Sequence, residues 1–86
     1  MENKIGVIAM VICDYDAVEK VNSVLHEFRD SVIGRMGIPY KQKNVNVISV
    51  VLDAPCEVLN SLSGKLGMIK GVTSKLVTHA GACERQ

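Results

Sequence analysis

The 86-residue sequence predicts an α+β fold with the element order β-α-β-β-α-β. Two similar units carry this prediction, since each reads as an apolar strand, an acidic turn and an amphipathic helix. The runs VICD at 11–14 and VVLD at 50–53 mark corresponding points of the two units. Right-handed crossovers then leave one compact solution. It is a ferredoxin-like sandwich, a four-stranded antiparallel sheet with the first and third strands central and both helices on one face.

The first half begins with an expected strand over 5–13, a β-rich apolar run bounded by charge on both sides. Asp16 and Glu19, three residues apart, fit a capping box, so we expect a helix over about 16–30. Its apolar residues recur at three- and four-residue steps, which is typical of one buried helix stripe. They are Val18, Val21, Leu25, Phe28 and Val32.

The centre of the chain is expected to form a hairpin. We expect the second strand over 31–38, where Gly34 and Gly37 mark a bulge or a close backbone approach. Residues 39–44 then form the turn. Asn44 is suited to the left-handed conformation that such a turn often needs.

The second half repeats the pattern, with a strand expected over 45–52 and Pro55 suited to the first turn of a second helix. Gly67 is a plausible end of that helix. The helix stripe consists of Val58, Leu59, Leu62 and Leu66. A fourth strand follows at 72–78. We therefore expect a single domain over 1–86, with an ordered core over about 3–79 and a loose tail at 80–86.

Composition limits the possible partners and the cellular compartment. A net charge of +1 without a basic stripe argues against direct binding of nucleic acid or of an anionic membrane. The apolar run at 5–13 is far shorter than the roughly 20 residues that span a bilayer. Cys13, Cys56 and Cys83 are scattered and odd in number, so they predict reduced thiols in a cytoplasmic protein rather than a disulfide framework.

The two central strands have no polar face. One face of the first strand carries Ile5, Val7, Ala9, Val11 and Cys13, and the other carries Ile8, Met10 and Ile12. The third strand has Val45, Val47 and Val51 on one face and Ile48, Val50 and Leu52 on the other. Two helices cover only one face, and an exposed apolar sheet promotes aggregation. We therefore expect a second copy to cover it, giving a homodimer or homotetramer. The alternative cover, the seven-residue tail, is too small.

The sequence offers no clear chemical centre, so we expect neither an enzyme nor a bound metal or cofactor. His26 and His79 lack a second ligand at a readable spacing, and His79 with Cys83 is only a weak metal pair. Asp14 and Asp53 read as turn and cap residues. No nucleophilic triad can be assembled, and the stretch 34–37 is too short to indicate a phosphate-binding loop.

A small basic patch is expected on the hairpin, where Arg35, Lys41 and Lys43 surround Tyr40. Most such patches are solvated turns. The functional alternative is a contact with an anion or with an acidic partner.

Several runs resemble the iron-only hydrogenase system regulator family. They are GRMGIPY at 34–40, VISVVLD at 47–53, and the pattern SGKLGxxxGV at 63–72. The runs NKIGV at 3–7 and VEKVN at 18–22 also fit the family, so the resemblance covers roughly residues 3–78. It implies an ACT-like domain, similar in fold to the sensing domain of nickel-responsive repressors. It also implies a regulatory module that forms dimers or tetramers through its sheets.

Two features of related domains are missing. Nickel repressors place histidines and a cysteine around the second and third strands, but residues 31–53 contain neither residue type. Amino-acid-binding ACT domains have a glycine in the turn after the first strand, whereas residues 14–16 are Asp-Tyr-Asp. No segment remains that could form a helix-turn-helix, so any effect on transcription would require a protein partner.

The sequence therefore predicts a non-enzymatic, ACT-like regulatory module that self-associates and senses a small ligand or a protein partner. Topology suggests a pocket at a subunit interface near Asp14, Tyr15, Arg35 and Tyr40. The alternative is an assembly or chaperone-like module of metalloenzyme maturation that binds no small ligand.

Overall fold

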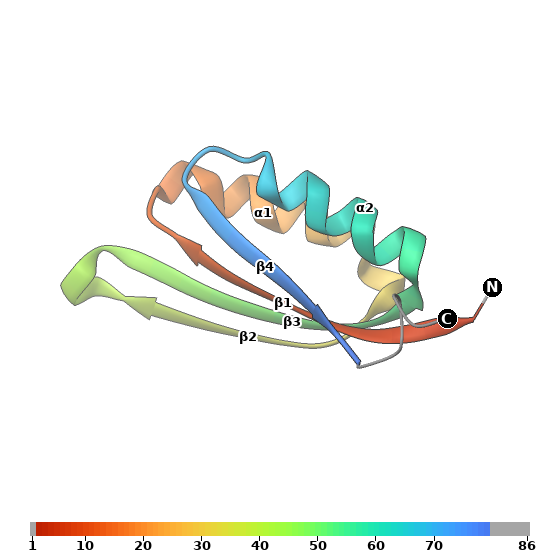
Figure 1. The fold of residues 1–86 in the computed structure, drawn as a ribbon. Coiled ribbons are helices and arrows are strands. Elements are labelled where there is room, and N and C mark those ends of the chain that lie inside the picture. The colour runs from red at the N-terminus through yellow and green to blue at the C-terminus, as the bar shows by residue number, and fades with distance from the viewer. Residues whose placement is uncertain (1, 80–86) are drawn as a thin grey trace.

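A computed structural model describes residues 2–79 and confirms the predicted element order and ferredoxin-like architecture (Figure 1). The tail predicted at 80–86 lies outside the described residues. The first half contains β1 (Asn3–Ile12), α1 (Tyr15–Glu27), the 3-10 turn η1 (Arg29–Ser31) and β2 (Val32–Tyr40). The second half contains the 3-10 turn η2 (Lys41–Lys43), β3 (Val45–Pro55), α2 (Cys56–Gly67) and β4 (Val72–Thr78).

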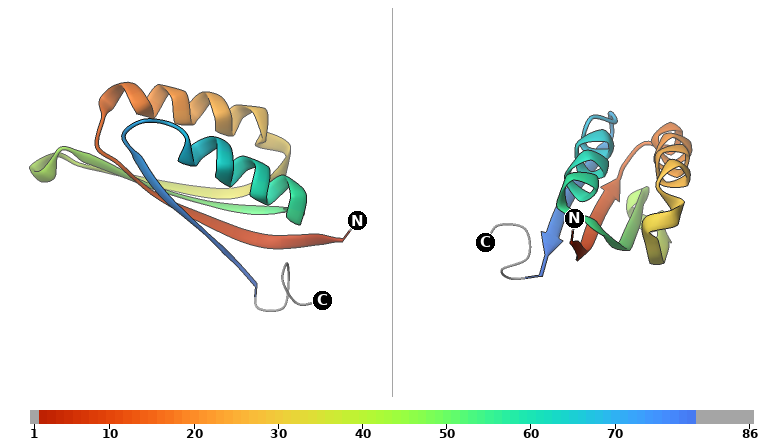
Figure 2. Two further views of the ribbon diagram at one scale, coloured as in Figure 1. Left: turned by 45° about the horizontal axis from the view of Figure 1, so that its top comes forward. Right: turned by 90° about the vertical axis from the view of Figure 1, so that its right-hand side faces the viewer.

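The four strands form one antiparallel sheet in the order β2-β3-β1-β4. Strands β1 and β3 are central, as predicted, and both helices cover the same face (Figure 2). The β2–β3 hairpin extends beyond the helix layer at one end (Figure 1). This arrangement leaves the opposite face of the sheet without a covering element among residues 2–79.

The core lies between the helices and the sheet and is entirely aliphatic, apart from Met10 and the edge contact of Phe28. The alternation of the central strands gave two apolar faces without deciding between them, and the face that carries Ile8, Met10 and Ile12 is the buried one. Side chains without solvent exposure include Ile8, Met10 and Ile12 of β1, Val50 and Leu52 of β3, Val21 of α1, and Leu59, Leu62 and Leu66 of α2. Their burial supplies most of the stability, at about 25 cal/mol per Å² of apolar surface.

Helix α1 begins earlier than the capping-box pattern predicted. Asp14, with φ −135° and ψ 121°, is the cap, and its carboxylate accepts a hydrogen bond from the amide of Asp16 at 3.0 Å. The prediction of Asp16 as the cap is therefore wrong by two residues. The helix ends at Glu27, because Phe28 leaves the helical region with φ −106° and ψ 18°.

The hairpin follows its predicted turn chemistry at Gly34 and Asn44 but not at Gly37, which pairs regularly with Ile48 and where a β-carbon would meet nothing within 4 Å. A bulge lies between Val32 and Gly34, and Asn44 is left-handed at φ 57° and ψ 40°. Strand β3 continues to Pro55, which is longer than predicted. Asp53 therefore lies within a strand and is not a turn or cap residue, and Pro55 precedes the first residue of α2.

The cysteines differ from one another. Cys13 is a free, exposed cysteine. Cys56 is disulfide-bonded, so the prediction of three reduced thiols is wrong for this residue. Cys83 lies outside the described residues.

Within residues 2–79, neither helix is long and apolar enough to cross a membrane.

Candidate functional site

The sheet surface opposite the helices is broadly apolar, and we call it the open face. Strand registry aligns its side chains in rows. One row runs from Val77 through Val7 to Val51, and another runs from Val11 through Val47 to Ile38. The apolar members are Ile5, Val7, Ala9 and Val11 of β1, Val45, Val47 and Val51 of β3, Met36, Ile38 and Tyr40 of β2, and Val77 of β4. The large side chains among them include six that are exposed, Ile5, Val11, Met36, Ile38, Tyr40 and Val77.

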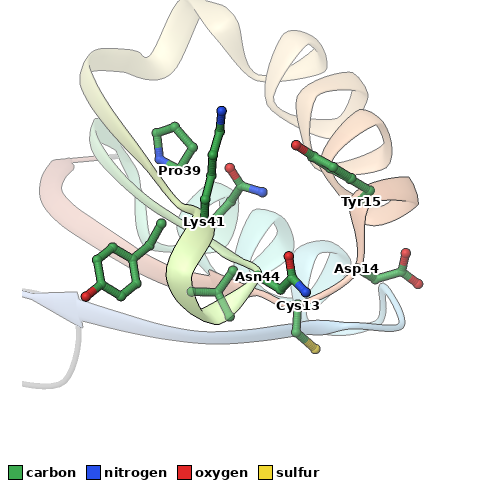
Figure 3. Close-up of a pocket in the computed structure, with 9 residues that line it drawn as sticks. Cys13, Asp14, Tyr15, Pro39, Lys41 and Asn44 are labelled. Atoms are coloured by element: carbon green, nitrogen blue, oxygen red, sulfur yellow. The ribbon is translucent and has the colours of Figure 1, made fainter.

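A hollow of about 260 Å³ lies at one end of the sheet, between the β1–α1 turn and the β2–β3 hairpin. We call it the hairpin hollow. Figure 3 shows Tyr15 on its helix side, with Pro39, Lys41 and Asn44 on its hairpin side. Its lining residues are Cys13, Asp14, Tyr15, Pro39, Tyr40, Lys41, Asn44, Val45 and Asn46.

Local folding explains why these segments meet. Ile12 pairs with Asn46, so the end of β1 and the start of β3 lie side by side. The amide of Cys13 donates to the carbonyl of Gly71 at 2.9 Å, which holds the β1–α1 turn against the loop before β4. The left-handed conformation of Asn44 closes the hairpin opposite that turn.

Two tyrosines, Tyr15 and Tyr40, line the hairpin hollow. A tyrosine offers a ring for apolar contact and a hydroxyl that both donates and accepts. Tyr15 is 80% exposed, although the other apolar side chains of α1 are buried or half-buried. Tyr40 lines the hollow and also belongs to the open face. The hollow and the open face are therefore continuous.

Three of the four residues predicted to form a ligand site, Asp14, Tyr15 and Tyr40, line the hairpin hollow. Arg35 does not. It is five residues before Tyr40 on β2, about 16 Å along the strand, and it lies opposite Val50 on the helix-covered side. Its guanidinium donates to Asn22 Oδ1 at 2.8 Å. The basic patch proposed around Tyr40 is divided in the same way, because Lys41 and Lys43 belong to η2 and Arg35 does not join them.

Lys41 was foreseen as part of the basic patch, but the other lining residues were not foreseen as site residues. Cys13, Pro39, Asn44, Val45 and Asn46 were assigned only to strands and a turn. The available signal was the sheet order, because antiparallel pairing of the first and third strands places residue 13 beside residues 45 and 46. Side-chain chemistry alone gave no such signal.

No group of three or more His, Cys, Asp or Glu residues gathers in a metal-binding arrangement within residues 2–79. No buried side-chain polar atom in this part of the chain lacks a hydrogen-bond partner. The described side chains therefore form no buried polar centre, and the polar groups of the hairpin hollow are those of its lining residues.

A family model described as "TM1266-like: Iron-only hydrogenase system regulator, putative" matches residues 4–76. This chain belongs to that family. The solved structure of the uncharacterized protein TM1266 from Thermotoga maritima is 33% identical, with a TM-score of 0.86, and the match covers 90% of this chain and 98% of that one. No curated protein matches the chain.

Two more distant structures share the fold alone. The C-terminal domain of the MgtC protein from Mycobacterium tuberculosis is 15% identical, has a TM-score of 0.63, and covers 94% of this chain and 93% of its own. A formyltetrahydrofolate deformylase from Pseudomonas putida KT2440 is 16% identical with a TM-score of 0.61. That match covers 85% of this chain but only 28% of the deformylase. These matches confirm the ferredoxin-like, ACT-like fold.

Proposed function

We propose that this family member is a small non-enzymatic regulatory module of an iron-only hydrogenase system. It self-associates through the open face and senses a small ligand in the hairpin hollow. The family description supports the regulatory role and its hydrogenase context. The observation that carries the proposal is the continuity of an uncovered apolar sheet face with a hollow that contains two exposed tyrosines.

The extent of the open face supports a second copy as its cover. Four strands spaced about 4.8 Å apart, with about eight residues each at ~3.3 Å per residue, project roughly 500 Å². Two such faces would bury about 1,000 Å² in total, which reaches the lower bound for a specific interface. A two-fold axis would place each open face against itself, the commonest way for one surface to be covered.

The position of Tyr40 supports a link between assembly and sensing. Because this residue belongs to both surfaces, a second copy on the open face would border the hairpin hollow. A ligand that fills the hollow would then contact residues whose environment differs between monomer and oligomer. Only such differential contact allows a ligand to shift an assembly equilibrium.

The second candidate function is an assembly module of metalloenzyme maturation that binds a protein and no small ligand. The projecting β2–β3 hairpin favours it, because this segment extends beyond the helix layer (Figure 1) and carries Lys41 and Lys43 at its tip. An extended arm with exposed cationic side chains can contact an acidic partner surface.

Native mass spectrometry of the purified chain tests the proposal. A dimer or tetramer with a reproducible extra mass is expected, and Tyr15→Ala with Tyr40→Ala should lose the extra mass. A bare oligomer whose partner binding is unchanged by these substitutions would support the assembly module. A bare monomer at micromolar concentration would contradict self-association through the open face.

A further inference from the structure

A second hollow, separate from the hairpin hollow, lies between α1 and the start of β2. It measures about 290 Å³ and is lined by Asn22, Leu25, His26, Arg29, Val32, Arg35 and Val50. Leu25 and Val50 are buried and supply an apolar floor. The polar lining residues are all exposed and surround that floor. We call it the arginine hollow.

The two arginines reach it from different elements, and each is held by a hydrogen bond to a neutral group. Arg29 Nη1 donates to the backbone carbonyl of His26 at 2.9 Å, so it remains beside the last turn of α1. Arg35 Nη2 donates to Asn22 Oδ1 at 2.8 Å, which holds it against the middle of the same helix. These bonds restrict the side chains without neutralising them.

Neither arginine has a carboxylate partner within residues 2–79. The ion pairs in this part of the chain join Lys4 to Glu2 and Lys65 to Glu27. A guanidinium carries five N–H donors in a planar fork, and each arginine uses one of them in the bonds above. The remaining donors of two uncompensated cations thus border one hollow, although the whole chain has a net charge of only +1.

We propose that the arginine hollow binds a small organic anion, with the oxyanion group held by Arg29 and Arg35 and the carbon portion resting on Leu25, Val32 and Val50. Arginine pairs bidentately with carboxylate and phosphate groups, which gives both strength and orientation. The apolar floor favours a ligand with a hydrocarbon or aromatic part over a bare inorganic ion. The inference does not rest on the function proposed for the hairpin hollow.

Such a ligand would also connect two parts of the fold. Arg29 belongs to η1 and Arg35 to the edge strand β2, on either side of the bulge between Val32 and Gly34. A single oxyanion bound by both would fix the start of β2 against α1. Strand β2 also contributes Met36, Ile38 and Tyr40 to the open face, so the site is placed to influence that surface from the opposite side of the sheet.

Titration of the ¹⁵N-labelled chain with phenyl phosphate, followed by amide NMR, tests the inference. We expect saturable shifts confined to residues 22–35 and to Val50, and weaker binding of inorganic phosphate. The double variant Arg29→Gln with Arg35→Gln should weaken phenyl phosphate binding at least tenfold. Arg35→Lys should lose part of the affinity, because it keeps the charge without the planar fork.

The matched control is Lys20→Gln with Lys70→Gln, which removes the same charge from two exposed residues that line neither hollow and should change the dissociation constant less than twofold. Equal losses of phenyl phosphate affinity in the two double variants would show that net charge alone causes the effect. That result would overturn the site. Shifts that never saturate in the millimolar range would also overturn it. Because both arginines are exposed, the variants should retain the wild-type amide spectrum, and the native oligomer mass reports separately on the open face.

Discussion

Gly71 approaches Asp14 so closely that a β-carbon at position 71 would stand 2.7 Å from the β-carbon of Asp14. Gly71 also has φ +91°, a region that residues with side chains rarely adopt. The same residue accepts the backbone hydrogen bond from Cys13. The loop before β4 and the turn that borders the hairpin hollow are therefore held together at a point where only glycine fits.

Gly71→Ala is expected to lower the free energy of unfolding by about 2–4 kcal/mol. Forcing a side chain into a left-handed conformation costs ~1–2 kcal/mol, and the contact with Asp14 adds a similar overpacking cost. Urea unfolding followed by circular dichroism measures the change. A loss below 0.5 kcal/mol would show that the backbone relaxes freely and that the close approach has no energetic consequence.

Gly64→Ala is the opposite case and should stabilise the chain by about 1 kcal/mol. Gly64 lies inside α2, and a β-carbon there would meet nothing within 4 Å. Alanine then gains the difference in helix propensity without a steric cost. A rise in melting temperature without a change in the amide pattern elsewhere is the expected observation, and a fall would contradict the open space around this position.

Asp14→Ala should destabilise α1 by about 1 kcal/mol, because it removes the carboxylate that accepts from the amide of Asp16. Asp14→Asn is the matched control, since asparagine retains a cap oxygen and should keep most of the stability. Hydrogen exchange of the first-turn amides of α1 would separate local fraying from global unfolding. Equal losses in the two variants would assign the effect to charge instead of capping.

Gly6 and Leu59 should be energetically coupled. A β-carbon at position 6 would lie 3.1 and 3.2 Å from the two methyl carbons of Leu59, which is fully buried. Gly6→Ala alone is expected to cost about 1–2 kcal/mol through overpacking. In a double-mutant cycle, Leu59→Val should relieve this cost. The double variant should then lose about 1 kcal/mol less free energy of unfolding than the two single variants lose together.

The contact between Gly6 and Leu59 also illustrates what the sequence could and could not predict. Apolar periodicity located the buried stripe of α2 and the two faces of β1 and β3, because packing follows the helix and strand repeats. The stripe predicted for α1 omitted the buried Ala17 and extended to Val32, which belongs to β2. The contribution of Gly6 depends on which leucine of α2 lies above it, and that is a tertiary contact without a local signal. The same holds for Gly71, whose close approach to Asp14 is also a tertiary contact.

The candidate site was predictable to the extent that strand topology determines it. Asp14, Tyr15 and Tyr40 meet because the first and third strands are adjacent and the hairpin follows directly. Arg35 was placed with them from the expected topology alone. In an extended strand, however, five residues span about 16 Å and reverse the face, so Arg35 faces α1.

Val11→Glu is expected to weaken self-association at least a hundredfold. Val11 is 46% exposed and lies on a central strand of the open face, between Thr73 and Val47. An interface there would bury the new carboxylate without a partner, at a cost of several kcal/mol, and about 2.8 kcal/mol corresponds to a hundredfold change. Sedimentation equilibrium measures the shift toward monomer.

Met68→Glu is the matched control, because it introduces the same charge at an exposed apolar residue beyond the end of α2, away from the sheet. It should leave the oligomer mass unchanged. If Val11→Glu does not fold, Ile38→Glu tests the same face of the sheet. Ile38 lies on the edge strand β2, so a charge there disturbs the central strands less. Folded Val11→Glu and Ile38→Glu variants that associate as tightly as Met68→Glu would assign any oligomer to a different surface.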